Sequence, residues 1–121
     1  MKNVFNEEEM DKKSFENRWV KFAFGPNRFI DTENLNIGIV EFYENKDIKS
    51  HSHNVEEAMY ILAGKGKIKI GNYVYIIKEK DFVYIPKNED HSVISDINRR
   101  LKILFVFGKV ALAPVTERVR S

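Results

Sequence analysis

Cysteine is absent from this chain of 121 residues, and proline, histidine and tryptophan are scarce, with three, three and one copies. Without cysteine the chain can form neither disulfides nor thiolate metal sites, so nitrogen and oxygen are the main donors left for a metal. The first twenty residues contain no apolar run. We therefore expect neither a signal peptide nor a membrane anchor, and the cytoplasm is the expected location.

Neither sign of charge is in clear excess, because 20 basic and 18 acidic residues give a formal net charge of +2 at pH 7. These charges are scattered, whereas a nucleic-acid binder would show a clustered stripe of lysine and arginine. We therefore expect a small-molecule ligand and no nucleic-acid partner. Hydrophobic residues make up 43% and aromatic residues 12% of the chain, a composition typical of one folded globular domain.

The middle of the chain alternates short runs of aromatic and β-branched residues with turn-forming residues. Such runs are typical of β-strands, and Gly71-Asn72 between two of them favours a tight hairpin. The stretch from Gly64 to Gly66 is expected to separate two further strands. Strands at roughly ten-residue spacing without helical periodicity predict an antiparallel barrel or sandwich, and the missing crossover helices exclude a parallel α/β fold. The expected strands are residues 19–24, 35–43, 58–63, 67–70, 73–78, 82–86, 91–95 and 101–107.

The two ends of the chain differ from this alternating pattern. Residues 1–17 are polar with sparse apolar positions, and we expect a polar arm or a short helix there. Residues 18–110 are the predicted barrel domain. Residues 111–121 lose the alternation and are a predicted C-terminal tail.

The three histidines form a pattern together with one glutamate. His51 and His53 lie two residues apart, so in a β-strand their side chains would point to the same face. Glu57 follows at the start of the next apolar run, and His91 comes from a distant segment that a closed barrel could bring near. A single histidine in a β-protein is more often a surface or hydrogen-bonded residue than a metal ligand, so the prediction of a metal site depends on all four positions together. Three imidazoles and a carboxylate suit a divalent transition metal (Fe, Mn, Ni, Co, Cu or Zn) and not calcium or magnesium.

Two stretches carry these residues. One reads NKDIKSHSHNVEEAMYILAG from Asn45 to Gly64, and the other reads KDFVYIPKNEDHSVIS from Lys80 to Ser95. They resemble the two motifs of the cupin family, G-x5-H-x-H-x3,4-E-x6-G and G-x5-P-x-G-x2-H-x3-N. The resemblance implies a small all-β barrel of the double-stranded β-helix (jelly-roll) type. It also implies a set of four metal ligands, which are His51, His53, Glu57 and His91.

The chain departs from the family pattern at four structural positions. Asn45, Lys80 and Asn88 stand where glycine is usual, and Ser95 stands where asparagine is usual. Asparagine tolerates the left-handed conformation better than other non-glycine residues, so Asn45 and Asn88 are expected to make the required turns. Lys80 lacks this tolerance, so the loop before Phe82 is where a change of geometry is expected.

A substrate pocket is expected on the face of the barrel that carries the ligands. Counting by twos from Glu57 and from His91 places four side chains on that face, and the resulting pocket is largely apolar. Arg28 could recognise an acidic group, although an exposed loop arginine more often has no specific role. The predicted pocket residues are Met59, Ile61, Val93 and Ser95.

A divalent ion with three neutral imidazoles and one carboxylate leaves a site charge of about +1, which favours anionic chelating molecules. The leading hypothesis is a metal-dependent cupin enzyme that acts on a small oxygenated or acidic metabolite by oxygenase, isomerase or lyase chemistry. The alternative is a non-catalytic barrel that binds or senses a metal or small molecule. Because every histidine is assigned to the metal, a separate acid or base would come from Glu56, a tyrosine, another carboxylate or metal-bound water.

We also expect a homodimer, because small barrels expose edge strands that can pair or exchange between two copies. The segment before Trp19 and the tail after Val110 are the expected participants.

Overall fold

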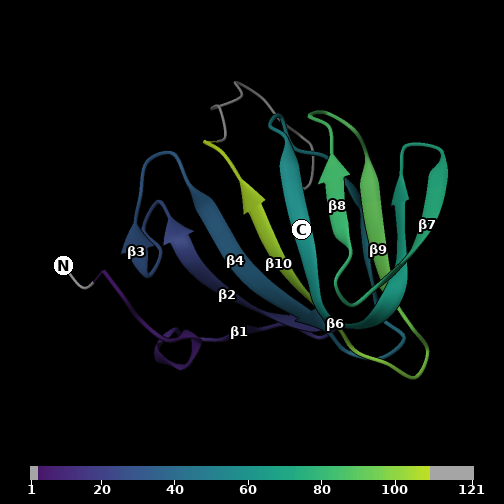
Figure 1. Ribbon diagram of the computed structural model, residues 1–121, viewed down its shortest axis with the longest axis horizontal. Coiled ribbons are helices and arrows are strands. Elements are labelled where there is room, and N and C mark those ends of the chain that lie inside the picture. The colour runs from purple at the N-terminus through teal and green to yellow at the C-terminus, as the bar shows by residue number, and fades with distance from the viewer. Residues whose placement is uncertain (1–2, 110–121) are drawn as a thin grey trace.

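The computed structural model describes residues 3–109, and within them the chain is almost entirely β (Figure 1). The predicted all-β jelly-roll class is confirmed, while the predicted tail at 111–121 lies outside the described residues. Within the described part, no helix is long and apolar enough to span a membrane. The elements are η1 (Glu7–Glu9), β1 (Lys13–Ser14), β2 (Arg18–Gly25), β3 (Ile30–Asp31), β4 (Asn36–Phe42), β5 (Asp47–His51), β6 (Glu57–Ile70), β7 (Tyr73–Lys78), β8 (Phe82–Ile85), β9 (His91–Ser95) and β10 (Leu101–Phe107).

The strands form two halves that share β6. The order β1-β2-β4-β10-β6 makes one half, and β8 pairs with the first part of β6. The other half follows β6-β9-β5, and β7 pairs with the second part of β6. All of these pairings are antiparallel; the parallel pair among the described strands joins β2 to the short β3. One long strand therefore passes from one sheet to the other, and the sheets curl around a common interior.

β6 remains one strand of 14 residues where two strands were expected. The predicted break at Gly64 is wrong because the chain bends there and stays paired. Gly64 has φ +88°, and a Cβ on it would lie 1.7 Å from the carbonyl oxygen of Arg100. Only glycine allows the two backbones to approach this closely, and that approach lets β6 change sheets.

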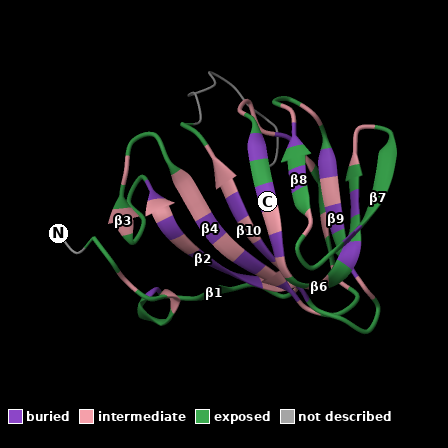
Figure 2. Ribbon diagram, viewed as in Figure 1, coloured by how far each residue is buried: buried purple, intermediate pink, exposed green. Residues whose placement is uncertain are grey.

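The core lies between the two curled sheets and follows the two-residue alternation of the strands (Figure 2). Ile61, Leu101 and Ile103 are fully shielded from solvent, and Ile68 and Ile85 are nearly so. Burial of such side chains stabilises the fold by about 1.5–3 kcal/mol each. The solvent-facing positions between them are mostly intermediate or exposed, as expected for sheets with one wet face.

Three non-glycine residues at the family's glycine positions adopt left-handed backbone conformations. Asn45 has φ 54° and Asn88 has φ 64°, so both asparagines make the turns expected of them. Lys80 has φ 79° and keeps the same geometry despite its unfavourable side chain. Its amide donates a hydrogen bond of 2.9 Å to the carbonyl of Ile61, which holds the turn against β6.

The N-terminal segment covers the outer face of β2. Its single-turn helix η1 is capped by Asn6, and β1 pairs with β2 of the same chain. Lys21 lies 3.4 Å from the carboxylate of Glu7, and the Trp19 indole donates a 2.8 Å hydrogen bond to Glu41. Because strand neighbours point to opposite faces, Arg18, Val20 and Phe22 point to the inside of the barrel.

Candidate metal centre

The four predicted ligands come from three neighbouring strands and one loop. His51 ends β5 and His91 begins β9, and the two residues are register partners across these strands. Glu57 is the first residue of β6. His53 lies in the loop after β5, so the prediction that His51 and His53 share one strand is wrong. The structure still brings their rings together, with centroids 5.0 Å apart.

The donor atoms of these residues converge on one space. One ring nitrogen from each of the three histidines lies within 4.8 Å of the others. The Nε2 atoms of His53 and His91 each lie 3.5 Å from Oε1 of Glu57. Two donors at about 2.1 Å from one tetrahedral ion are themselves roughly 3.4 Å apart. The spacing therefore fits a shared ion better than direct hydrogen bonds, which are about 2.7–3.2 Å long.

Backbone carbonyls orient two of the rings. The Nδ1 atom of His51 lies 2.9 Å from the carbonyl oxygen of Lys49, and Nδ1 of His91 lies 3.1 Å from that of Glu89. A carbonyl can only accept, so in each ring Nδ1 carries the proton and donates it. The Nε2 lone pairs are then left for a metal, which is the arrangement that outer hydrogen bonds impose on metal-binding histidines.

The burial of the Glu57 and His91 donor atoms is the strongest sign of a cation-binding site. Glu57 is 6% exposed and His91 is 1% exposed. Oε1 of Glu57 and Nε2 of His91 are both buried without a hydrogen-bond partner. A buried carboxylate oxygen that accepts no hydrogen bond is costly, and a coordinated cation would satisfy both atoms. The residues present therefore fit a divalent transition metal held by three nitrogens and one oxygen.

The protonation of His91 follows from opposing effects. Burial alone lowers the pKa of His91, but the Glu57 carboxylate, the Glu89 carbonyl and the charge of Asp90 outweigh it. The net pKa is raised above the ordinary value of 6.5. In the metal-free protein, Glu57 thus favours a protonated His91 in the place of the absent positive charge.

The four predicted ligands line one side of a cavity of about 450 Å³ inside the barrel. That size suits a small organic molecule. Its walls are mainly apolar, and stacking on one of them orients His53, whose ring lies parallel to Phe107 at 5.6 Å. The apolar lining consists of Phe15, Val20, Phe22, Val40, Phe42, Ile48, Met59, Val93, Ile103, Phe105 and Phe107.

The predicted pocket residues divide into two pairs. Met59 and Val93 line the cavity beside the histidines, while Ile61 and Ser95 do not. All four side chains are buried, but counting by twos carries no information on their depth in the barrel. Ile61 is fully buried in the core, and the Ser95 hydroxyl donates to the Tyr43 carbonyl and accepts from the Lys46 amide.

Three cationic residues that the sequence did not predict as pocket residues line the cavity. Lys13, Arg18 and Arg28 all line it. The Arg28 guanidinium lies over the ring of Phe22, 3.7 Å from its centroid. Alternation within the strand could have placed Arg18 beside Val20 and Phe22, but no local signal shows that the turn after Gly25 returns Arg28 to the barrel.

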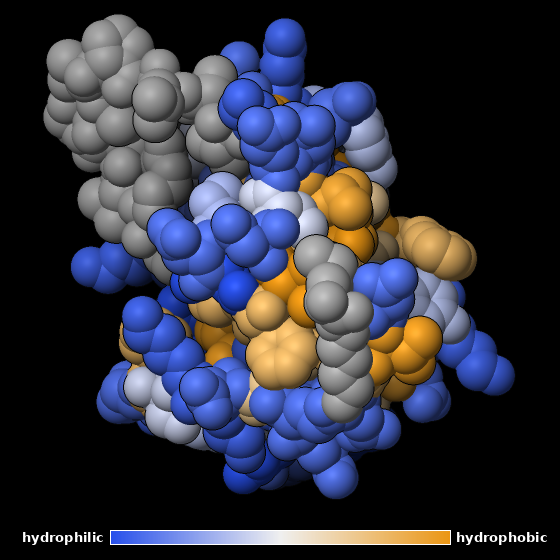
Figure 3. Space-filling view, turned by 90° about the vertical axis from the view of Figure 1, so that its left-hand side faces the viewer, coloured by the Kyte–Doolittle hydropathy of each residue, from blue (hydrophilic) through white to orange (hydrophobic). Residues whose placement is uncertain are grey.

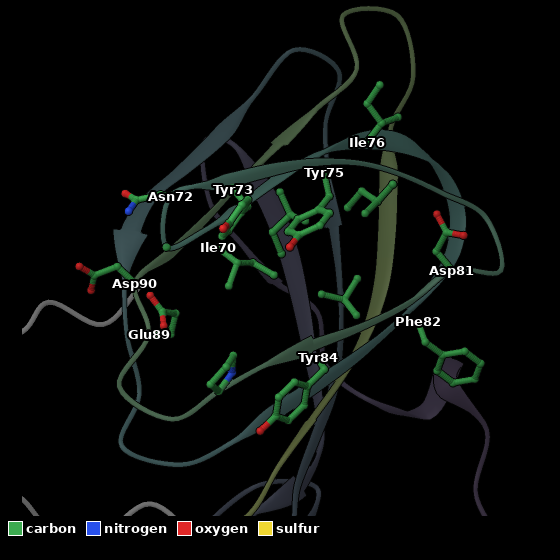
Figure 4. Close-up of a pocket in the computed structure, with 15 residues that line it drawn as sticks. Ile70, Asn72, Tyr73, Tyr75, Ile76, Asp81, Phe82, Tyr84, Glu89 and Asp90 are labelled. Atoms are coloured by element: carbon green, nitrogen blue, oxygen red, sulfur yellow. The ribbon is translucent and has the colours of Figure 1, made fainter.

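A second hollow, of about 780 Å³, lies between β7 and β8 and contains none of the histidines (Figure 4). Its labelled side chains include Tyr73, Tyr75, Tyr84 and Phe82, together with carboxylates (Figure 4). On the face of the molecule that carries β3, apolar side chains gather in the middle and hydrophilic side chains surround them (Figure 3).

Comparisons with known proteins agree on the domain type. The family model of the cupin domain matches residues 38–107, which include all four predicted ligands. A comparison with curated protein sequences gives no match.

Solved structures of low sequence identity share the fold. The polyketide cyclase RemF from Streptomyces resistomycificus has a TM-score of 0.79 at 13% identity, covering 94% of this chain and 89% of that one. An RmlC-like cupin from Shewanella frigidimarina has a TM-score of 0.77 at 11% identity, covering 91% and 93%. A Bacillus subtilis oxalate decarboxylase variant has a TM-score of 0.76 at 18% identity, covering 90% of this chain and 30% of that longer one. At these identities the likeness shows the fold alone.

Proposed function

The chain belongs to the cupin family, and from this premise we propose that it is a metal-dependent enzyme acting on a small oxygenated or acidic metabolite. His51, His53, Glu57 and His91 are the proposed ligands of a divalent transition metal. The observation that carries the proposal is the pair of buried, unpartnered donor atoms, Oε1 of Glu57 and Nε2 of His91. When bound, the metal would supply Lewis acidity or redox chemistry to a substrate in the cavity.

The cavity lining narrows the chemistry that the chain's own residues can support. Its titratable side chains are the four proposed ligands and the cations Lys13, Arg18 and Arg28. No tyrosine and no second carboxylate belongs to the described lining. Glu56, a candidate base from the sequence, instead accepts a hydrogen bond from Tyr84, and neither of these lines the cavity. Among oxygenase, isomerase and lyase reactions, this lining favours those that need no carboxylate or tyrosine base.

Metal analysis tests the proposal directly. Protein purified without a metal-binding tag should contain about one equivalent of a transition metal, or gain it from Fe, Mn, Ni or Zn. His91→Ala or Glu57→Gln should lower the affinity for metal by at least about tenfold. Glu56→Gln is the matched control and should retain full loading, because Glu56 lies outside the cavity. Wild-type protein that neither contains nor gains a metal would refute the proposal.

The same lining also favours the second candidate, a barrel that binds or senses a small molecule without turnover, because the described lining contains no tyrosine and no carboxylate besides Glu57. Metal-loaded protein can be incubated with small oxygenated acids, and the products and dioxygen consumption measured. A crystal structure with anomalous scattering then identifies the ion and any retained ligand. Turnover that disappears in Glu57→Gln supports the enzyme, and a ligand retained unchanged supports the binding barrel.

We further propose that the protein is cytoplasmic, that its partner is a small molecule and not nucleic acid, and that it forms a homodimer. The absence of cysteine agrees with a reducing compartment. The dimer is supported by exposed apolar side chains on β7 and β8, which pair with β6 alone among the described strands. Tyr73, Ile76 and Phe82 on these strands are 70%, 68% and 81% exposed. Light scattering at micromolar concentration should give twice the chain mass, and a monomer would contradict this expectation.

A further inference from the structure

The charged groups of the metal-site cavity are sorted to two sides. The proposed metal ligands come from β5, β6, β9 and the loop after β5. The cations come from β1, β2 and the turn that follows β2, where Lys13, Arg18 and Arg28 lie. The cavity thus has a metal-binding side and a separate cationic side.

Two strands separate these sides. β4 and β10 lie between β2 and β6 in the sheet order (Figure 1). Phe22 registers with Gly38, Gly38 with Phe105, and Phe105 with Met59. Three spacings of about 4.8 Å each give roughly 14 Å along the sheet between Phe22 and Met59, and the curl of the sheet shortens the straight path. A ligand that contacts both sides must therefore be elongated.

A continuous aromatic wall joins the two sides. The Phe22 and Phe105 rings meet edge to face at 5.9 Å, and Phe105 stacks with Phe107 at 6.1 Å. Phe107 then stacks with His53 at 5.6 Å. The row leads from the cation over Phe22 to a proposed metal ligand. Such a surface favours a flat apolar body that can stack on the rings.

Arg28 is held at its end of this wall. Its amide donates to the Gly25 carbonyl at 3.2 Å, and the Asn27 amide donates to the Asp31 side chain at 2.9 Å. A Cβ on Gly25 would lie 2.9 Å from Cγ of Arg28, so the glycine makes room for the arginine's stem. Arg28 is exposed, but its guanidinium also lies over the Phe22 ring, so it differs from a loop arginine without contacts.

The cationic side has no internal counter-charge. Within residues 3–109, no carboxylate forms an ion pair with Lys13, Arg18 or Arg28, although five other basic side chains do form such pairs with acidic groups. The Arg18 guanidinium donates a hydrogen bond to Asn17, and burial lowers its pKa. Cations left unpaired at a largely apolar cavity favour an anionic ligand group.

We propose that the ligand is a flat, apolar carboxylate whose metal-binding oxygens and carboxylate lie at opposite ends, and that Arg28, assisted by Arg18, binds the carboxylate. A carboxylate fits better than a phosphate dianion, because the latter costs more to transfer into apolar walls. The metal-binding end of this assignment rests on the proposed function, and the carboxylate end does not.

Caffeate is a suitable probe, with a catechol at one end and a carboxylate at the other. Zn²⁺ is the metal of choice because it has no redox chemistry. Titration calorimetry would compare the binding of caffeate with that of its neutral primary amide. The proteins are wild type, Arg28→Gln and the double variant Arg18→Gln/Arg28→Gln. Arg99→Gln is the control, because it changes an exposed arginine that does not line the cavity. We expect Arg28→Gln to weaken caffeate about fivefold and the double variant more than tenfold. Amide binding should stay unchanged, and Arg99→Gln should match wild type for both probes.

The outcomes separate this inference from the proposed function. If Zn²⁺ binds but Arg28→Gln affects caffeate and its amide equally, or neither, the inference is wrong and the metal site stands. If neither Zn²⁺ nor Fe, Mn or Ni binds, the proposed function fails, and 3,4-dimethoxycinnamate on metal-free protein tests the carboxylate end alone. If Arg28→Gln loses binding of 3,4-dimethoxycinnamate but still binds the corresponding amide, the result supports Arg28 as the carboxylate-binding residue. Equal binding of 3,4-dimethoxycinnamate to wild type and Arg28→Gln overturns that role.

Discussion

At the scale of single residues, Glu57 and His91 give the metal-free protein a pH response. Burial lowers the pKa of His91, but Glu57, Glu89 and Asp90 raise it overall above 6.5. The interaction of protonated His91 with Glu57 therefore stabilises the folded protein. This stabilisation is complete below the unfolded-state pKa near 6.5 and is lost as the pH rises through the higher folded-state pKa. We expect the Tm of metal-free protein to fall over this range.

Thermal unfolding of metal-free wild type and Glu57→Gln across this pH range checks the expectation. The variant removes the carboxylate that raises the pKa, so its Tm should fall less with rising pH. Equal slopes for the two proteins would contradict the role given to Glu57. Added metal should reverse the trend, because a metal binds only neutral imidazole and so stabilises more at higher pH.

Lys80 is a second residue whose replacement has a defined effect. Its φ of 79° costs a non-glycine residue about 1–2 kcal/mol, whereas glycine adopts this conformation freely. Part of that gain is offset by the greater flexibility of glycine in the unfolded chain. Lys80→Gly should raise the free energy of unfolding by about 0.5–1 kcal/mol in urea titration. Lys87→Gly, at an exposed turn position without positive φ, should lower it.

At the scale of elements, Phe22 of β2 and Phe105 of β10 meet in the aromatic wall because Gly38 of β4, which lies between them, lacks a side chain. A Cβ there would lie 2.5 Å from Cζ of Phe105 and 2.7 Å from the Lys21 carbonyl oxygen. The second contact is with backbone and cannot move cheaply. We expect Gly38→Ala to destabilise the protein by about 1–3 kcal/mol, as overpacking does. Gly108→Ala, whose Cβ would meet nothing closer than 4.0 Å, is the control and should change stability by less than about 0.5 kcal/mol.

Strands rich in aromatic and β-branched residues were predictable from the sequence, including β7 and β8 at the edges, whereas the short or polar strands β1, β3 and β5 were not. Alternation identified β2, β4, β8, β9 and β10, because each buries side chains on one face, and β7 was identified from its aromatic and β-branched residues although Ile77 is its one buried position. β5 was missed because Asp47–His51 is polar and has no fully buried position. β1 and β3 are two residues long and carry no pattern. The resemblance of the two motifs implied the ligand set, which stays a prediction, whereas the position of Arg28 at the cavity depends on a turn conformation that no local pattern encodes.

At the scale of the whole molecule, the metal site joins both sheets, since β5 and β9 belong to one half and the first part of β6 to the other. A bound ion should therefore stabilise the entire barrel. Free metal at about 100 times Kd adds about 2.7 kcal/mol, a rise in Tm of roughly 10 °C for a domain of this size. Removing the metal with a chelator should lower Tm by that amount in calorimetry. No such change is expected for His91→Ala.

The strands that carry the ligands are unequally anchored. Within residues 3–109, β6 is paired along both edges, whereas β5 ends the sheet order and pairs with β9 alone. Edge strands open locally at lower free energy than strands paired on both sides. Opening of β5 would withdraw His51 while Glu57 keeps its place on β6. The lifetime of a bound ion is then governed by brief detachment of one edge strand, and ions can exchange without global unfolding of the barrel.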